Sequence, residues 1–530
     1  MTDTPSRTPV AIVGGGPVGL ALALGLARHG IHSTLLERRP ATNQQSRAPA
    51  IHQRSLEILR QWAVADTLLA AGTLKRTLPM HPGPTSRRPM LSFDFTTLDH
   101  DTDQAGLLFL EQGQTERLLL AALRGTGRCD IHFGTEVVGL DAGADEVRLT
   151  VHDAAGTRTL PADYVVGCDG TGSFVRDALG LPFPGHDFPL RPLLADVRVT
   201  DHRDQLPWPR IHNGRRGVTG AQRLAPGHWR IIRVEPGDPA PADPVPDHEL
   251  DARVREVLGD GPVEVLWASR FRFQRRSSPR FRVGRVLLAG DAAHAFPPAN
   301  GQGMNAGIQD AHNLAWKLRY ALTGGDADRL LDSYDVERRA MVGSVSRNVS
   351  QLTRLGLQAP RAVRGAVFQL MRLGLAIPAG HRARVRNLAM LDQRVPASPL
   401  IAATDRAAGQ RLPNPLLIAP NGDRVRLYDL LGVGPALLRL TQAAEPAPTA
   451  EPAPTAPGLR QLMIGPTGHR DPSGGLSRLL GADAGWLLVR PDLQLAWART
   501  TSSDLAGAID HALGLTADGR RELAGGVTPG

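Results

Sequence analysis

The chain has 530 residues, of which 42% are hydrophobic and 21% charged, a composition typical of soluble globular proteins and a length sufficient for about three domains. Its two cysteines, Cys129 and Cys168, stand at no metal-ligand spacing. The cysteines therefore support neither a disulfide framework nor a thiolate zinc site, and they favour a reducing compartment. The net charge is +9, but the 61 basic residues are interspersed with 52 acidic ones, so the pattern does not indicate nucleic-acid binding.

An apolar stretch over residues 10–27 has the composition of a signal peptide core. It is broken by Gly14-Gly15-Gly16-Pro17, and neither a positive cluster nor a small-residue cleavage site brackets it, so a strand, a turn and a helix explain it better. No other run approaches the roughly 18 apolar residues of a spanning helix. We therefore expect a cytoplasmic protein without a membrane partner.

The first motif is a glycine fingerprint between a predicted strand and a predicted helix. The strand covers residues 10–13, the fingerprint is Gly14-x-Gly16-x-x-Gly19, and the helix ends near His29. In a dinucleotide-binding unit the first glycine permits the tight turn, the second lets a pyrophosphate approach the backbone, and the third allows close packing of helix and strand. The N-terminus of this helix, predicted at Val18 directly after Pro17, then faces the anion.

A second predicted strand over residues 33–36 ends at Glu37, which Arg38 follows. Glu37 stands 18 residues after Gly19, about where an acid binds a ribose hydroxyl. An acid there disfavours a 2′-phosphate. The pocket is therefore predicted to bind FAD or NAD rather than NADP.

Two later segments repeat the order of apolar strand, glycine and acid. Residues 164–167 lead into Cys168-Asp169-Gly170, and residues 285–289 lead into Gly290-Asp291. Asp291 can accept hydrogen bonds from a sugar-alcohol chain such as ribityl. A turn or helix-capping aspartate remains the alternative.

The third segment continues through Pro297-Pro298 to Gly301-Gln-Gly303-Met304-Asn305 and a helix predicted over residues 306–322. A glycine-bearing helix start presents amides and the positive end of the helix dipole, which would stabilise negative charge on a reduced flavin ring. The prolines would stiffen the loop beside that ring, although an ordinary proline turn explains them almost as well.

Together, the segments Gly14 to Gly19, Tyr164 to Arg176 and Gly290 to Asn305 resemble the FAD-dependent aromatic hydroxylases, also called group A flavoprotein monooxygenases. The third segment is the specific one. The resemblance implies that Arg47 lies near the FAD phosphates, that Gln114, at the start of a helix predicted over residues 115–123, contacts the cofactor, and that the backbone of Val137 meets the adenine. The cofactor site expected from the motifs and the resemblance comprises Gly14, Gly16, Pro17, Gly19, Glu37, Arg38, Arg47, Gln114, Val137, Asp169, Asp291, Pro298, Gly301, Gly303, Met304 and Asn305.

The resemblance also implies a reaction. NADPH or NADH would reduce FAD transiently, O₂ would add at flavin C4a, and the hydroperoxide would hydroxylate a phenolic or polycyclic aromatic, polyketide-like substrate. Baeyer–Villiger oxygenation or oxidative rearrangement of an aromatic polyketide is the close alternative, and an FAD-dependent dehydrogenase is a further one. A basic binding protein with a vestigial dinucleotide fold is the alternative from another class.

The expected fold is α/β, with three domains. A discontinuous Rossmann-like FAD-binding domain is expected over residues 1–77, 106–182 and 274–395, and a β-sheet substrate-binding domain over 78–105 and 183–273. Alternating stretches such as Trp229–Val234 predict strands of that sheet with one solvent-facing side. Residues 396–530 resemble the thioredoxin-like domain of phenol and polyketide hydroxylases. They contain no cysteine, so a thiol-redox role is excluded and packing or dimer contacts are expected, in a monomer or a homodimer. A twice-repeated Glu-Pro-Ala-Pro-Thr-Ala, from Glu445 and Glu451, predicts a stiff, disordered insertion.

Absent motifs narrow the interpretation. No second Gly-x-Gly-x-x-Gly precedes a helix, so a separate nicotinamide domain is not expected, and the 17 histidines form no metal motif. His294 is most simply a hydrogen-bonded structural histidine. No catalytic base is named, because the four tyrosines lie outside the predicted substrate sheet: Tyr164, Tyr320, Tyr334 and Tyr428.

Overall fold

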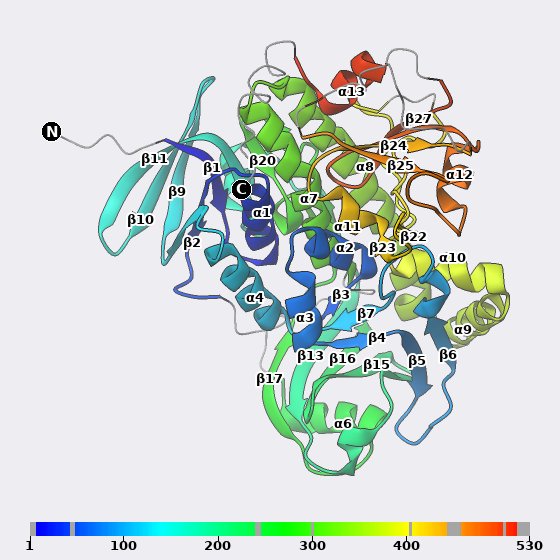
Figure 1. Ribbon diagram of the computed structural model, residues 1–530. Coiled ribbons are helices and arrows are strands. Elements are labelled where there is room, and N and C mark those ends of the chain that lie inside the picture. The colour runs from blue at the N-terminus through cyan, green and yellow to red at the C-terminus, as the bar shows by residue number, and fades with distance from the viewer. Residues whose placement is uncertain are drawn as a thin grey trace.

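The computed structural model describes residues 7–42, 48–238, 245–297, 301–401, 405–442, 456, 458–501 and 505–516. Of the two predicted repeats, which begin at Glu445 and Glu451, only Ala456 lies within these residues. The described chain is α/β, as predicted, with a central sheet and its helices, a second large sheet below them, and a smaller C-terminal unit at the side (Figure 1).

An eight-stranded sheet forms the centre of the N-terminal part, with the order β19-β20-β11-β1-β2-β8 along its main path. The pairs β1–β11, β1–β2, β2–β8 and β11–β20 are parallel, and β9 and β10 extend the sheet through antiparallel pairs. Its strands are β1 (Thr8–Val13), β2 (Ser33–Glu37), β8 (Cys129–Phe133), β9 (Glu136–Ala142), β10 (Val147–Asp153), β11 (Gly156–Gly167), β19 (Arg282–Val283) and β20 (Val286–Leu288).

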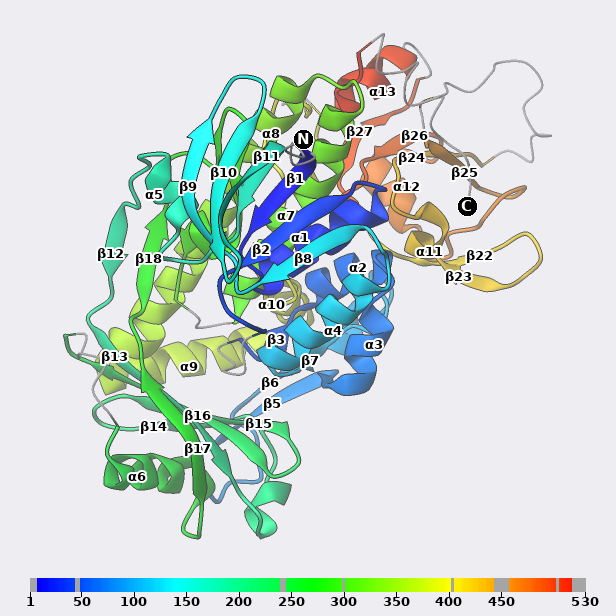
Figure 2. The same cartoon turned by 90° about the vertical axis from the view of Figure 1, so that its left-hand side faces the viewer.

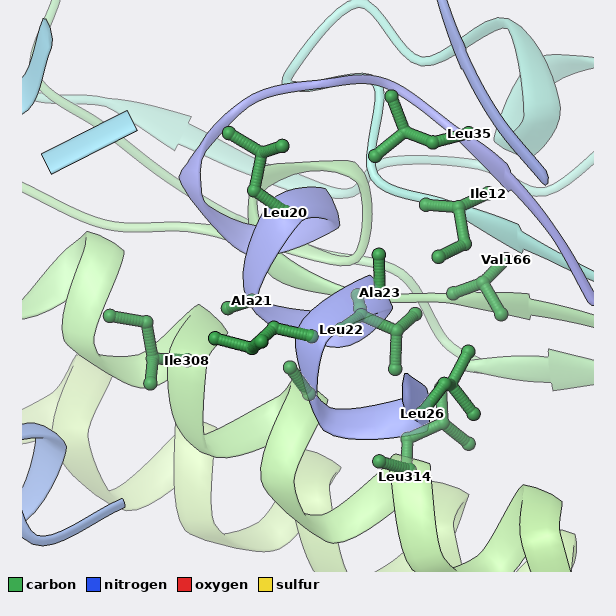
Figure 3. Packing of buried hydrophobic residues seen from close by; sticks show 14 of the residues in the cluster. Ile12, Leu20, Ala21, Leu22, Ala23, Leu26, Leu35, Val166, Ile308 and Leu314 are labelled. Atoms are coloured by element: carbon green, nitrogen blue, oxygen red, sulfur yellow. The ribbon is translucent and has the colours of Figure 1, made fainter. Parts of the chain in front are cut away.

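Helix α1 (Pro17–Arg28) packs between this sheet and α7 (Gln302–Leu322). Figure 3 shows Ile12 and Val166 of the sheet on one side of α1 and Ile308 of α7 on the other. All three side chains are fully buried, and each such apolar side chain stabilises the fold by about 1.5–3 kcal/mol. The helix predicted over residues 306–322 begins four residues earlier, so the glycine-bearing segment is its first turn.

Further helices surround this core. They are α2 (Gln53–Gln61), α3 (Ala65–Ala71), α4 (Gln112–Arg124), α5 (Phe174–Ala178) and α8 (Ala327–Thr353). Two three-stranded sheets are also present. One consists of β3 (Ala50–Ile51), β4 (Thr73–Lys75) and β7 (Leu107–Phe109), and the other consists of β12 (Gly185–Asp187), β18 (Gln274–Ser277) and β21 (His294–Ala295). Among the described residues, no helix is both long and apolar enough to cross a membrane.

A seven-stranded sheet lies below the central part, in the order β17-β13-β16-β15-β14-β5-β6 (Figures 1 and 2). Its strands are β5 (Thr77–Pro82), β6 (Leu91–Asp94), β13 (Leu190–Arg198), β14 (Arg210–Asn213), β15 (Val218–Ala225), β16 (His228–Pro236) and β17 (Glu264–Arg270). Short 3₁₀ helices η1 (Phe95–Leu98) and η2 (His202–Gln205) follow β6 and β13.

The prediction that residues 229–234 have one solvent-facing side is wrong. Trp229 and Ile231 pack against α6 (Asp247–Leu258), and Arg230 and Arg233 are each only 3% exposed. Both arginines are paired with carboxylates, Arg230 with Asp196 and Arg233 with Glu235 and Glu256. The strand therefore has two buried faces, and each of them contains one arginine that is paired with carboxylates.

A π-helical turn η4 (Arg354–Gln358) follows α8, and α9 (Arg361–Ala376) and α10 (Pro378–Leu388) come after it along the seven-stranded sheet. The C-terminal unit contains a four-stranded sheet of order β25-β24-β26-β27. Its elements are β22 (Leu416–Ile418), β23 (Arg424–Arg426), α11 (Leu427–Leu431), β24 (Ala436–Leu440), β25 (Arg460–Ile464), α12 (Gly475–Leu480), β26 (Gly485–Val489), β27 (Leu495–Arg499) and α13 (Leu505–Leu513).

Candidate cofactor site and family

The three sequence motifs meet at one edge of the central sheet. Val13 at the end of β1 pairs with Gly167 at the end of β11, and the amide of Ala289, after β20, donates to the Gly167 carbonyl at 2.9 Å. Gly290, in the 3₁₀ turn η3 (Gly290–Ala292), lies against Val18 in the first turn of α1. This is the carboxyl edge of parallel strands, where open α/β sheets bind their ligands.

The glycines of the first motif have distinct surroundings. A Cβ on Gly14, whose φ is +109°, would stand 2.5 Å from the Cys168 carbonyl oxygen, and one on Gly19 would stand 2.0 Å from the Gly14 carbonyl oxygen. A Cβ on Gly16 would meet nothing within 4 Å. Gly14 and Gly19 are thus required by packing, whereas the space beside Gly16 at the start of α1 fits a pyrophosphate.

Glu37 is buried at the end of β2 and holds the glycine loop. Its Oε2 accepts the Gly15 amide at 2.6 Å, and its Oε1 accepts Arg39 Nε at 2.8 Å. Burial opposes ionisation of Glu37, but the hydrogen bonds from Arg39 and Gly15 outweigh it and lower the pKa. Arg38 is exposed; sequence reasoning missed Arg39, the residue that pairs with Glu37.

The two other acids of the motifs have different surroundings. Asp169 accepts hydrogen bonds from the Ser173 hydroxyl at 2.5 Å and the Val175 amide at 3.1 Å, so it caps the start of α5, and burial raises its pKa. Asp291 is exposed on η3, beside the start of α1. Asp291 is therefore the acid of the motifs whose carboxylate is accessible to a ligand.

A buried polar network supports the turn that carries Asp291. Asp310 of α7 accepts the Gly290 amide at 2.9 Å, His294 Nε2 lies 2.7 Å from its carboxylate, and Arg338 of α8 donates to it at 2.6 Å. Burial opposes ionisation of Asp310, but Arg338 and His294 lower its pKa. The expected structural role of His294 is confirmed. Asp310 and Arg338 carry no motif signal, because only the fold brings them to the turn.

The first turn of α7 is fixed by Asn305. Its Nδ2 donates to the carbonyls of Ala50 and Gly301, and its Oδ1 accepts the His52 amide at 2.8 Å. Gly301 precedes the helix with φ +64°, and a Cβ on Gly303 would meet nothing within 4 Å. Met304, also predicted to belong to the site, is 8% exposed. The space beside Gly303 at a helix N-terminus fits an electron-rich group of a cofactor.

The start of α4 lies three residues before the predicted start, at Gln112. Gln114 accepts a hydrogen bond from Arg117 on the same helix, whereas Gln112 Oε1 accepts the amide of Ala48 at 3.2 Å. Gln112 therefore reaches Ala48, the residue that follows Arg47 in the sequence. Sequence reasoning missed Gln112, and its place in the first turn of α4 is the signal that could have found it.

Val137 is buried in β9, close to the end of β2, where the Thr135 amide donates to the Glu37 carbonyl at 3.0 Å. Arg47 and Pro298 lie outside the described residues. Within the described part of the chain, no group of His, Cys, Asp and Glu side chains could hold a metal ion.

Comparison with known proteins agrees with this geometry. Residues 7–349 match the FAD binding domain family, and residues 405–516 match the aromatic-ring hydroxylase C-terminal family. The chain is 33% identical to an aromatic compound monooxygenase, YhjG, of Bacillus subtilis over 508 residues, which are 93% of this chain and 94% of the relative.

Solved structures are similar along almost the whole chain. Anhydrotetracycline hydroxylase OxyS from Streptomyces rimosus superposes with a TM-score of 0.79 at 30% identity, covering 97% of this chain and 100% of that one. The Diels–Alderase PyrE3 of pyrroindomycin biosynthesis superposes with a TM-score of 0.77 at 28% identity, covering 96% and 100%. The chain belongs to the FAD-dependent aromatic hydroxylases, the group A flavoprotein monooxygenases.

Proposed function

We propose that this monooxygenase uses NADPH or NADH and O₂ to hydroxylate a phenolic or polycyclic aromatic, polyketide-like substrate. The observation that carries the proposal is the convergence of the glycine loop, Asp291 and the start of α7 at one sheet edge. Bound FAD would supply the oxygen activation. The chain's own residues bind that cofactor, orient the substrate and exclude water.

Each motif has a separate binding task. The open space beside Gly16 and the α1 N-terminus suit the pyrophosphate. Asp291 suits the ribityl hydroxyls, and Gly301 to Asn305 suits negative charge on the ring system. No second dinucleotide fingerprint is present in the sequence, which supports transient binding of the nicotinamide rather than a resident site.

The side chains on one face of the seven-stranded sheet favour an aromatic substrate. Ile232 and Gln222 on its face away from α6 are only half-buried, and Ile232 packs near Phe271 and Leu357. A face of apolar and aromatic side chains with a few polar groups suits planar ring systems. The similarity to an anhydrotetracycline hydroxylase favours a polycyclic substrate over a simple phenol.

No tyrosine lies on this sheet. Tyr164 is in β11, Tyr320 in α7, Tyr334 in α8 and Tyr428 in α11, and Tyr334 donates to the Leu288 carbonyl at 2.7 Å. Burial raises the pKa of Tyr320 to about 12. These side chains are therefore unsuited to deprotonate a substrate, and we propose that the acidity of the bound phenol itself suffices.

The test is the absorbance of the purified protein followed by anaerobic addition of NADPH or NADH with a panel of polycyclic phenols. We expect a yellow protein that bleaches faster with one phenol and recolours with O₂. A protein that remains colourless after FAD is added would overturn the proposal.

A second candidate is a rearrangement or Baeyer–Villiger reaction on the same scaffold, favoured by the similarity to a Diels–Alderase. Product mass and structure separate the candidates. Hydroxylation adds one oxygen to an intact ring, Baeyer–Villiger reaction inserts one beside a carbonyl, and cyclisation leaves the mass unchanged. An FAD-dependent dehydrogenase would turn over with another electron acceptor in the absence of O₂.

The substitution Asp291→Ala tests the cofactor site. We expect FAD affinity to fall by roughly 10- to 150-fold, equivalent to about 1.5–3 kcal/mol for one lost charge-assisted hydrogen bond. Flavin fluorescence titration of the apoprotein measures the affinity. The control is Asp130→Ala, because Asp130 is an exposed acid near the start of β8. It therefore lies at the amino end of the parallel strands, whereas Asp291 follows their carboxyl ends. Unchanged affinity in Asp291→Ala would remove Asp291 from the site.

A further inference from the structure

A chain of charged side chains connects the seven-stranded sheet with the start of α4. His228, the first residue of β16, places Nδ1 2.8 Å from Glu111 Oε1. Its Nε2 lies 3.5 Å from Asp196 Oδ2 of β13, an ion-pair contact longer than a hydrogen bond. Asp196 also accepts Arg230 Nε at 2.7 Å and Arg230 Nη2 at 2.8 Å, and Trp267 Nε1 at 2.8 Å.

The two carboxylates belong to different parts of the fold. Asp196 lies on the sheet, opposite Arg230 in the β13–β16 register, so their side chains share one sheet face. Glu111 is the N-cap residue of α4 and directly precedes Gln112, whose side chain accepts the Ala48 amide. His228 is therefore the side chain that joins the sheet to the α4 start and, through Gln112, to the segment beginning at Ala48.

Protonation of His228 balances the charge of this group. Asp196 and Arg230 are 2% and 3% exposed, and the His228 and Glu111 side chains are 22% and 31% exposed. With a neutral histidine, two carboxylates would face one guanidinium. Asp196 and Glu111 together raise the pKa of His228 to about 9, although burial opposes this. In return, contact with His228 lowers the pKa of Glu111.

We propose that protonated His228 is a positioning residue, which holds the substrate-binding face of the seven-stranded sheet in register with the cofactor-binding part through Glu111 and Asp196. The substrate-binding role of that face rests on the proposed function. In this proposal, His228 itself contacts neither the substrate nor the flavin. It fixes the sheet that carries Arg230 relative to the helix start that carries Gln112.

The pH dependence has a definite sign. Because the pKa of His228 in the fold, about 9, exceeds its ordinary value of 6.5, its contribution is fully present below about pH 6.5 and is lost as the pH rises through 9. The groups that face His228 are Glu111 before α4, Asp196 on β13 and, beyond Asp196, Arg230 on β16. Both carboxylates have lowered pKa values, so the alkaline change belongs to the histidine.

The test compares His228→Gln, Glu111→Gln and the double variant with the parent protein. The control is His152→Gln, an exposed histidine on β10 that lies 3.0 Å from Thr157. Hydrogen exchange of peptides covering residues 107–116 and 225–230 is measured in the apoprotein, with FAD affinity by fluorescence titration and the ratio of hydrogen peroxide formed to NADPH consumed.

We expect His228→Gln to accelerate exchange severalfold in both peptides at pH 7, to weaken FAD binding severalfold and to raise the peroxide ratio. The double variant should show no larger change in exchange, FAD affinity or peroxide ratio than either single variant, because each substitution breaks the same contact between His228 and Glu111. The difference between parent and His228→Gln should disappear by about pH 10. Additive effects, unchanged exchange in 107–116, or a pH-independent difference would overturn the proposal.

These readouts separate this inference from the proposed function. If the parent protein binds no FAD, the proposed function fails, while the exchange measurement in the apoprotein still decides whether His228 bridges the two parts. If FAD binds and His228→Gln matches the parent at every pH, only the role of His228 fails.

Discussion

Gly14 and Gly16 belong to the same fingerprint but have different constraints. Gly14→Ala would place a Cβ 2.5 Å from a backbone oxygen at φ +109°, whereas Gly16→Ala would place one in open space. We expect Gly14→Ala to destabilise the fold by about 1–3 kcal/mol or more, because its backbone would be strained. We expect Gly16→Ala to have the same melting temperature as the parent protein but to bind FAD more weakly. Thermal unfolding and flavin fluorescence measure the two effects. Equal melting temperatures for both variants would contradict this.

At the residue scale, the sequence predicts where the motifs lie. It does not predict which of two nearby polar residues makes a given contact. Gln114 and Gln112 are two residues apart on α4, and two residues correspond to about 200° around a helix, so only one can face Ala48. The choice depends on where the helix begins, which a sequence pattern locates only to within a few residues. Arg38 and Arg39 raise the same difficulty, because consecutive side chains after a strand point in opposite directions.

The start of α7 depends on partners that are distant in sequence. Arg338→Met should leave Asp310 buried without its cation, and removing one partner of a buried pair costs about 3–5 kcal/mol. Urea unfolding measures this loss. Arg339→Met is the matched control, since Arg339 is 41% exposed and pairs with Asp335 on the same helix, where such a pair is worth about 0–1 kcal/mol. Similar losses in both variants would show that the Asp310 network does not stabilise α7.

At the element scale, apolar runs identified β1, β20 and the last four residues of β11, because parallel strands are buried on both faces. The same reasoning failed for β16, where Arg230 and Arg233 stand among apolar residues and lead to the expectation of a solvent-facing side. Their carboxylate partners come from β13 and α6 as well as from β16 itself. A charged residue can be predicted to be buried only when its partners of opposite charge are known. The partners on β13 and α6 are distant in sequence, and only the tertiary fold brings them to β16.

At the scale of the whole molecule, a second buried network joins the C-terminal unit to the central helices. Arg490, after β26, donates two hydrogen bonds of 2.8 Å to Glu337 of α8, and Lys317 of α7 donates to Glu337 at 2.7 Å. Asn313 of α7 donates to Asp492 at 2.8 Å. The side chains of Arg490, Glu337 and Lys317 are fully buried. The cysteine-free C-terminal unit therefore has a packing role that rests on specific charges as well as on apolar contacts.

Arg490→Met tests this attachment. Burial opposes ionisation of Glu337, but Arg490 and Lys317 lower its pKa far below the usual range, so removing Arg490 leaves a buried carboxylate that has lost the larger of its two cationic partners. We expect a loss of about 3–5 kcal/mol and separate unfolding of the C-terminal unit, seen as a second calorimetric transition. Arg478→Met, which changes an exposed arginine on α12, should change stability by less than about 0.5 kcal/mol. Because the side-chain hydrogen bonds of Arg490 go to Glu337 and Asp492 rather than to Asp310, which supports the turn that carries Asp291, FAD affinity at 20 °C should stay within about twofold of the parent in Arg490→Met. A single unshifted transition in Arg490→Met would mean that apolar packing alone holds the two parts together.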